Sequence, residues 1–87
     1  MPIVWIPALL RELTGGEEKL SVPGGTVQQV IDHLDERYPG LKARLCDEGR
    51  LRPNIVVVVD GIASRQQLRH PLIETSEVHF VPAISGG

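Results

Sequence analysis

The sequence predicts an α+β domain in which a mixed sheet of four to five strands carries one main helix packed on one face. Three observations support this fold class. An apolar stripe of helical period runs through residues 27–38, short β-branched segments lie on both sides of it, and Gly- or Pro-containing turns separate the segments. The 87 residues have the length of one domain. We expect the domain to span residues 1–82, with a flexible tail at 83–87.

The N-terminal part of the chain predicts two strands joined by a loop. Ile3–Ile6 is short, apolar and β-branched, which is typical of a strand. Residues 8–13 have the composition of one helical turn, and the Thr-Gly-Gly sequence at 14–16 ends it. Leu20 and Val22 alternate with polar neighbours, so they predict a half-buried strand.

The best-defined element is a helix that begins after Thr26. Its apolar positions follow in steps of three and four, which places them on one face. These positions are Val27, Val30, Ile31, Leu34 and Tyr38. Thr26 with Gln29 three residues later fits a capping box, and the Pro-Gly pair at 39–40 ends the helix. Leu41 and Leu45 indicate a second, short helical segment.

Two further strands are predicted in the C-terminal half. Residues 55–59 are a continuous β-branched run that ends at an Asp-Gly turn signal. Such a run is typical of a strand buried on both faces, and it also fits a strand with one face left for a partner. The last strand is expected at 77–81, with Pro82 ending its pairing. We expect the first and last strands to lie side by side in the centre of the sheet.

Composition argues against several classes of function. The net charge of −2 argues against a nucleic-acid surface and against a polybasic membrane contact. No segment approaches the ~20 apolar residues of a membrane-spanning helix. The N-terminus carries no basic leader, so we expect a cytoplasmic protein. The single cysteine excludes an internal disulfide.

No catalytic or metal-binding set is predicted. His33, His70 and His79 lack the spacing of metal ligands, and no second cysteine supports them. Cys46 could carry a persulfide, although a lone cysteine is more often a small buried hydrophobe. The sequence therefore predicts a protein that is not itself an enzyme.

The most informative segment is the end of the chain, Ile84-Ser85-Gly86-Gly87. A Gly-Gly terminus is a carboxylate with almost no side chain near it, and the missing Cβ atoms let another backbone approach closely. A narrow groove of another protein can therefore grip the tail and lead its carboxylate to a reactive centre. The alternative interpretation is an ordinary frayed terminus.

The whole layout resembles the MoaD/ThiS family of ubiquitin-like β-grasp sulfur carriers. Four segments carry the resemblance: the first loop at 6–16, the helix at 26–34, the strand and turn at 53–61, and the closing strand-proline-Gly-Gly signature at 80–87. The first loop and the tail are most similar to the CysO-type branch, whose members carry sulfur for cysteine synthesis. Ser85 stands where alanine is common in the family.

The resemblance implies a carrier that other enzymes use as a substrate. An E1-like enzyme of the MoeB/ThiF type would adenylate the Gly87 carboxylate with ATP, and a sulfur donor would displace AMP to leave a thiocarboxylate. No cofactor is expected to bind the carrier itself. Recognition of the tail would fall to Ala83, Ile84, Ser85 and Gly86.

A partner-docking patch is predicted beside the tail. We expect Phe80, Ile84 and the outer face of Val56 and Val58 to form an exposed apolar surface. The alternative is that Phe80 belongs to the core.

The resemblance leaves several pathways and partners open. The cysteine route would use a cysteine synthase homologue and a JAMM-type metalloprotease. A MoaD-like subunit would bind the large subunit of molybdopterin synthase, and carriers for thiamin or tRNA thiolation have the same tail chemistry. Two other classes are a ubiquitin-like protein modifier and a plain interaction domain with an idle tail.

Overall fold

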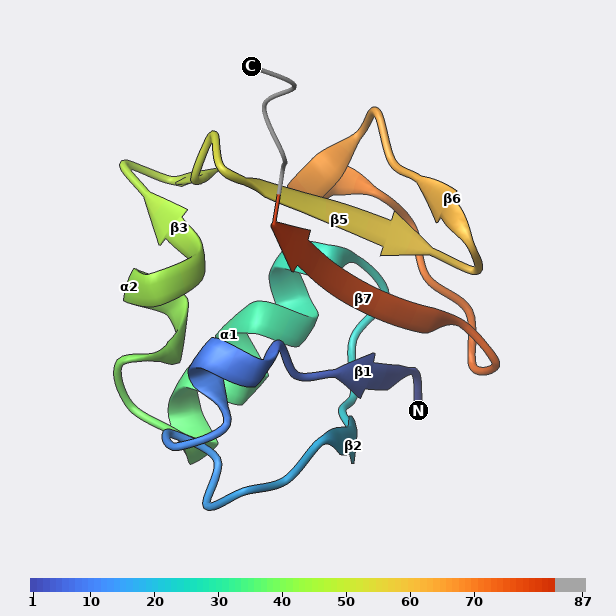
Figure 1. Cartoon of the computed structure of the whole chain (residues 1–87). Coiled ribbons are helices and arrows are strands. Elements are labelled where there is room, and N and C mark those ends of the chain that lie inside the picture. The colour runs from blue at the N-terminus through green and yellow to red at the C-terminus, as the bar shows by residue number, and fades with distance from the viewer. Residues whose placement is uncertain (83–87) are drawn as a thin grey trace.

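The computed structural model describes residues 1–82, so the predicted tail at 83–87 lies outside the described residues. A five-stranded mixed sheet forms one layer, and helix α1 (Val27–Arg37) packs against one face of it (Figure 1). The strands in spatial order are β2 (Lys19–Ser21), β1 (Ile3–Trp5), β7 (Glu77–Pro82), β5 (Ile55–Val59) and β6 (Ile62–Ala63).

The last strand of the described chain is the central strand of the sheet. β7 pairs in parallel with β1, where Val4 lies opposite Val78, and antiparallel with β5 on its other side. The edge strands are β2, which pairs antiparallel with β1, and β6, which pairs antiparallel with β5. The predicted contact between the first and last strands is therefore confirmed.

The predicted start of the main helix is confirmed in detail. The Thr26 hydroxyl oxygen accepts a hydrogen bond from the backbone N–H of Gln29 at 3.2 Å. The Gln29 side-chain oxygen accepts from the N–H of Gly25 at 2.7 Å, one residue earlier than in a standard capping box. The first bond satisfies a donor that a helix start otherwise leaves free, and the second holds the preceding residue against the first turn.

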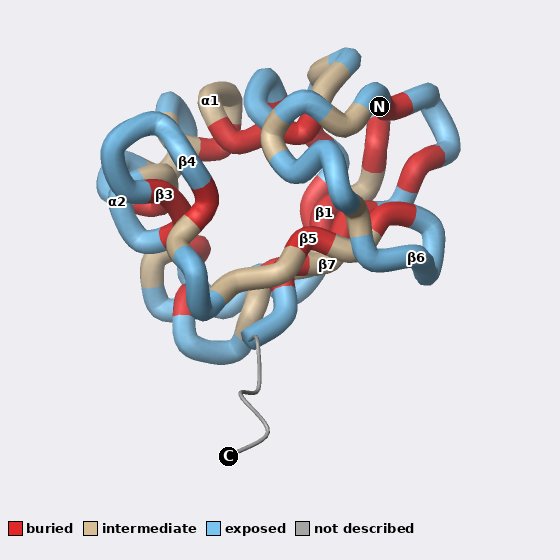
Figure 2. Tube along the Cα trace, turned by 90° about the horizontal axis from the view of Figure 1, so that it is seen from above, coloured by how far each residue is buried: buried red, intermediate tan, exposed pale blue. Residues whose placement is uncertain are grey.

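The core lies between the sheet and the helices (Figure 2). The helix contributes four of the five predicted face residues, Val27, Val30, Ile31 and Leu34, each at most 1% exposed. The fifth, Tyr38, is the C-cap just after the helix and packs against the core only partly buried. The sheet contributes Val4, Leu20, Val57, Val59, Val78 and Phe80. The predicted second helix, α2 (Leu41–Leu45), closes one side of this core with Leu41 and Leu45. Burying each large aliphatic side chain contributes about 1.5–3 kcal/mol.

Four short elements are not evident in the sequence. The strands β3 (Cys46–Asp47) and β4 (Arg50–Leu51) form a separate hairpin, and β6 adds a two-residue edge. The predicted helical turn at 8–13 is the 3₁₀ helix η1 (Ala8–Leu10), and a second one, η2 (Gln67–Arg69), precedes the last strand. Elements of two or three residues carry too little periodicity to predict.

Two expectations about the C-terminal strands are wrong. Pro82 does not end the pairing, because it is the last residue of β7 and lies opposite Ile55. β1 has already ended beside His79, so Pro82 has a neighbouring strand on one side only, and such an edge position tolerates the missing donor. The run at 55–59 is not buried on both faces, because Val57 and Val59 are buried while Val56 and Val58 are half-buried. This pattern fits the alternative interpretation, in which one face of the strand is left uncovered by the core.

None of the helices within residues 1–82 is long and apolar enough to cross a membrane.

Candidate functional site

The predicted reactive tail continues from the end of β7. Gly87, Gly86, Ser85, Ile84 and Ala83 lie outside the described residues, so their roles stay predictions. What the structure establishes is the base of the tail. Pro82 closes the central strand, which is paired with β5 up to this residue. The tail therefore starts from one of the most firmly held strands of the sheet.

The predicted docking patch is split between the two faces of the sheet. Val56 and Val58 face away from the core, and their partners across β7 are Val81 and His79. Phe80 pairs with Val57 and is only 4% exposed. The prediction that Phe80 forms one exposed patch with Val56 and Val58 is therefore wrong, and the alternative, that it belongs to the core, is confirmed. The cause is the alternation of side chains along a strand, which puts neighbouring positions on opposite faces.

The outer face of the sheet continues from these valines to an aromatic cluster. The Trp5 ring stacks on His79 with centroids 5.2 Å apart and planes 7° apart. Lys19 Nζ lies 5.4 Å from the centre of the Trp5 ring, and Trp5 Nε1 donates a hydrogen bond to Glu77 Oε1 at 3.0 Å. His79 is thus held in a structural contact with Trp5, and no sequence signal indicates this contact.

The other two histidines also make local contacts. His33 Nδ1 lies 2.7 Å from the carbonyl oxygen of Pro23, and His70 Nδ1 lies 2.7 Å from Ser64 Oγ. The Ser64 oxygen also accepts backbone hydrogen bonds at the start of η2, so it organises that turn. Within residues 1–82, no group of three or more His, Cys, Asp or Glu side chains could hold a metal ion.

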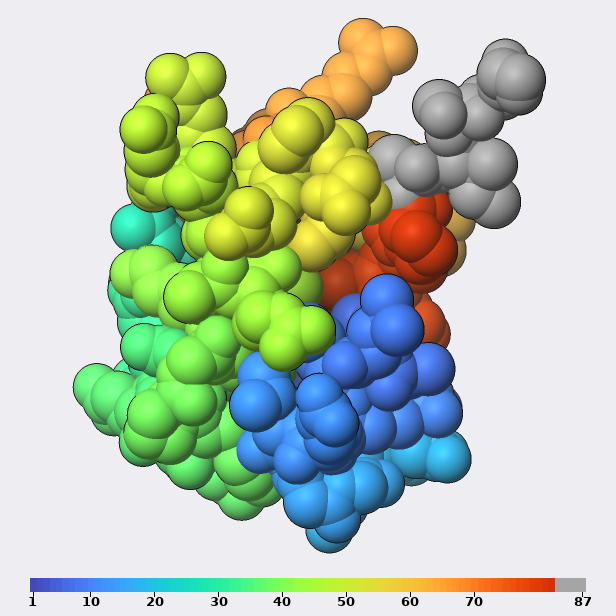
Figure 3. All heavy atoms as spheres, turned by 60° about the vertical axis from the view of Figure 1, so that its left-hand side comes forward, coloured from blue at the N-terminus to red at the C-terminus, as the bar shows by residue number. Residues whose placement is uncertain are grey.

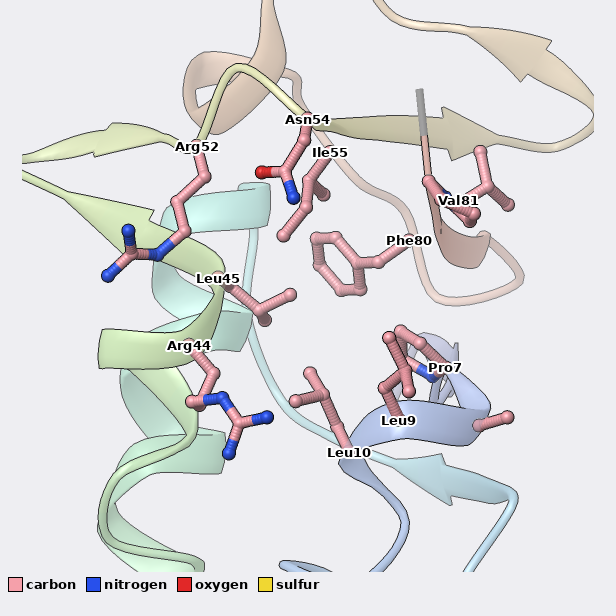
Figure 4. Close-up of a pocket in the computed structure, with 12 residues that line it drawn as sticks. Pro7, Leu9, Leu10, Arg44, Leu45, Arg52, Asn54, Ile55, Phe80 and Val81 are labelled. Atoms are coloured by element: carbon pink, nitrogen blue, oxygen red, sulfur yellow. The ribbon is translucent and has the colours of Figure 1, made fainter. Parts of the chain in front are cut away.

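An apolar groove opens on the inner side of the strand that leads to the tail. It encloses about 400 Å³ where η1, α2 and the adjoining ends of β5 and β7 meet (Figure 3). Leu10, Leu45, Ile55 and Phe80 point toward one another across it (Figure 4). The rest of its lining is Pro7, Ala8, Leu9, Arg44, Arg52, Asn54, Val81 and Pro82. Phe80 is thus a core residue whose ring also forms the floor of a surface groove.

One rim of this groove is cationic. Arg52 donates from Nε and Nη2 to the carbonyl oxygen of Ala43, at 3.2 and 2.8 Å, which fixes its guanidinium group beside α2. Arg44 is exposed on the same side (Figure 4). Neither arginine takes part in an ion pair among residues 1–82. No sequence signal marks the groove, because its lining comes from segments far apart in the chain.

Cys46 is buried at 8% exposure, in agreement with the interpretation as a core residue. Burial raises the pKa of its thiol, which the nearby Lys42 ammonium only partly opposes. The thiol is therefore protonated at neutral pH and poorly nucleophilic.

We expect iodoacetamide at pH 7 to alkylate Cys46 in the folded protein at least about tenfold more slowly than in the urea-unfolded chain. Mass spectrometry of timed samples measures both rates. Equal rates would mean that the thiol is accessible and would revive the persulfide role.

Comparison with known proteins agrees with this architecture. The ThiS family model matches residues 4–87. The sulfur carrier protein CysO of Mycobacterium tuberculosis strain H37Rv is 34% identical over 89 residues, which cover 97% of this chain and 96% of the relative. The CysO of Mycobacterium bovis has the same identity and coverage.

Solved structures show the same β-grasp fold over the whole chain. A chain of the Amycolatopsis orientalis BexX/CysO complex has a TM-score of 0.92 at 35% identity and covers 100% of both chains. Mycobacterium tuberculosis CysO has a TM-score of 0.91 at 30% identity, with 97% of this chain and 100% of that chain covered.

A third structure comes from an archaeal modifier. Small archaeal modifier protein 1 of Methanosarcina acetivorans has a TM-score of 0.81 at 28% identity, with 99% of this chain and 95% of that chain covered. Family model, curated relatives and solved structures thus agree over nearly the full length. The predicted resemblance is confirmed: the chain belongs to the ThiS family, and it is a sulfur carrier related to the CysO proteins rather than a catalyst.

Proposed function

We propose that this chain carries sulfur as a thiocarboxylate on the carbonyl carbon of Gly87 and delivers it for cysteine synthesis. The observation that carries the proposal is the match to CysO proteins from end to end, together with a family match that includes residue 87. The described structure supports it, because the strand that leads to Gly87 is central and well paired.

The proposed chemistry follows from the weakness of a carboxylate as an electrophile. The activating enzyme transfers AMP from ATP to the Gly87 carboxylate and releases pyrophosphate, which gives a mixed anhydride with a good leaving group. A sulfur nucleophile then attacks the carbonyl carbon, the C–O bond to AMP breaks, and the thiocarboxylate remains. ATP is used by the enzyme, and no cofactor bound to the carrier is part of the proposal.

The length of the tail sets what a partner enzyme must do. Residues 83–87, if fully extended, span at most about 17 Å. The active site must therefore lie at the end of a narrow channel, while the folded body rests against the channel's rim. The channel would hold the tail residues Ala83, Ile84, Ser85 and Gly86. The two glycines at the end of the tail suit a narrow channel, because they have no side chain.

The proposed partners follow from this chemistry. An E1-like enzyme of the MoeB/ThiF type would adenylate the tail, a cysteine synthase homologue would accept the sulfur, and a JAMM-type metalloprotease would release the product. One solved relative was crystallised as a BexX/CysO complex, which supports binding of a partner by carriers of this kind. Val56 and Val58, now with Val81, are proposed as the docking surface on the outer face. The need for ATP favours the cytoplasm.

The test is to incubate the protein with its activating enzyme, ATP and a sulfur donor. Mass spectrometry of the intact chain should show the shift of one oxygen-to-sulfur exchange, and the sample without ATP should not. Adding the cysteine synthase homologue and an activated serine should then move the carrier to a cysteinyl adduct. A carrier that never gains sulfur would overturn the proposal.

A modifier function would give a different result in the same system. The similarity to small archaeal modifier protein 1 makes this outcome worth measuring. A modifier would form isopeptide bonds between Gly87 and lysines of other proteins, and an immunoblot of cell extract would show these adducts as a ladder. We expect no such ladder.

A further inference from the structure

We infer that the groove between η1 and α2 receives a segment of the activating enzyme in which a large apolar side chain stands next to an aspartate or glutamate. The inference rests on the proposed function, since it concerns the enzyme that takes the tail. It names a second contact surface, which adjoins the outer face at Val81 and otherwise lies on the opposite side of β7 from Val56 and Val58.

The groove lies within reach of any enzyme that holds the tail. Val81 and Pro82 form one of its walls, and the next residue begins the tail. Because about 17 Å of tail must reach into the enzyme, the protein surface around Pro82 is pressed against the rim of the enzyme's channel. A rim that surrounds the tail therefore covers the opening of the groove.

The lining of the groove favours an apolar group. Nine of the twelve lining residues are apolar, and the cavity of about 400 Å³ has the size of a small ligand site. Leu9 lies at the opening of the groove and is 81% exposed, which is a high exposure for a large apolar side chain. A side chain of the enzyme that enters here would cover Leu9 and displace water from an apolar surface.

The charge of the rim favours an acidic group beside that apolar one. Arg44 and Arg52 both line the groove on its α2 side, and neither pairs with an acidic residue of the described chain. The protein as a whole carries a net charge of −2, so the positive charge of this rim is opposite in sign to the net charge of the chain. The guanidinium of Arg52 is already oriented by Ala43, and guanidinium groups bind carboxylates in a bidentate geometry. An aspartate or glutamate of the enzyme is the matching group.

The test compares two exposed positions at the groove with two exposed positions that do not line it, one in η2 and one in β6. Arg44→Glu and Leu9→Asp change the rim and the lip without touching the core, since both side chains are exposed. The matched controls are Arg69→Glu and Ile62→Asp, which make the same changes at exposed positions. Ile62 lies beside Val59, whereas the groove lies beside Ile55, about 14 Å away along β5.

We expect each groove variant to raise the KM of the activating enzyme for the carrier at least tenfold, with kcat unchanged, and each control to stay within twofold. Binding of the wild-type carrier should also weaken with added salt, and this salt dependence should be smaller for Arg44→Glu. Chemical-shift mapping of the labelled wild-type carrier with the enzyme should place perturbations at Leu9, Arg44 and Asn54. Circular dichroism checks that all four variants are folded.

Two results are separable. If the wild-type carrier becomes a thiocarboxylate and the groove variants behave as the controls do, with no perturbation at the groove, the inference is wrong and the proposed function stands. If the wild-type carrier binds the enzyme through the groove but never gains sulfur, the proposed function is wrong.

Discussion

One alanine added after Gly87 is expected to lower the yield of thiocarboxylate about 100-fold or more, while the folded body stays intact. The extra residue moves the reacting carboxylate by up to about 3.3–3.6 Å along an extended tail. Misplacement of a reacting atom by only about 1 Å can cost a factor of roughly 100 in rate. Intact-mass spectrometry after reaction with the activating enzyme, ATP and a sulfur donor measures the yield.

Two variants of unchanged length show whether the position of the carboxylate is the cause. Ser85→Ala replaces one small residue by another and should keep the wild-type yield. Gly87→Ala keeps the length but places a Cβ beside the reacting carbonyl, so its yield should fall through crowding. A wild-type yield from the extended chain would contradict the assignment of Gly87 as the reactive residue.

Phe80→Ala is expected to lower the free energy of unfolding by about 3–5 kcal/mol. The ring is 4% exposed and packs in the core cluster opposite Val57, so its removal leaves a large cavity. A domain of this length has only about 4–13 kcal/mol of stability in total. The melting temperature should therefore fall by about 10 °C or more, as measured by circular dichroism.

Val81→Ala is the matched control for this change. Val81 is the next residue of the same strand, but it lies on the outer face and is 38% exposed. Its truncation should cost less than about 1 kcal/mol, because little apolar surface is uncovered. Equal losses at both positions would mean that the two faces of β7 are not as different as the structure indicates.

The main helix and the central strands could be predicted because their signals are local. Thr26 and Gln29 act within one turn of helix, and the apolar face of α1 repeats often enough to fix its phase. β6 is not evident in the sequence, although the Asp60-Gly61 turn signal before it is. Both turn residues have positive φ, at 51° and 85°, as in a hairpin turn, but the strand that follows has only two exposed residues.

The candidate site could be predicted only in part. A run of five β-branched residues has no alternation, so the sequence could not tell that Val57 faces the core and Val56 does not. The sequence therefore does not show that Phe80 shares the inner face with Val57 and not the outer face with Val56 and Val58. The groove was missed because Leu9, Leu45, Ile55 and Phe80 come from four segments, which only the packed structure brings together. The tail residues follow from the chemistry of a Gly-Gly terminus and from the resemblance to the family's closing signature, and they stay predictions.

The place of β7 in the sheet has a consequence for synthesis of the protein. The strand made last joins β1–β2 to β5–β6, and without it the sheet falls into two separate pairs. Its pairing with β1 links Val4 to Val78, nearly the full length of the chain apart. Contacts so distant in sequence slow folding, because a long loop must close before they form. The nascent chain therefore completes its sheet only after β7 has been made, so shorter chains expose apolar surface and invite aggregation or degradation.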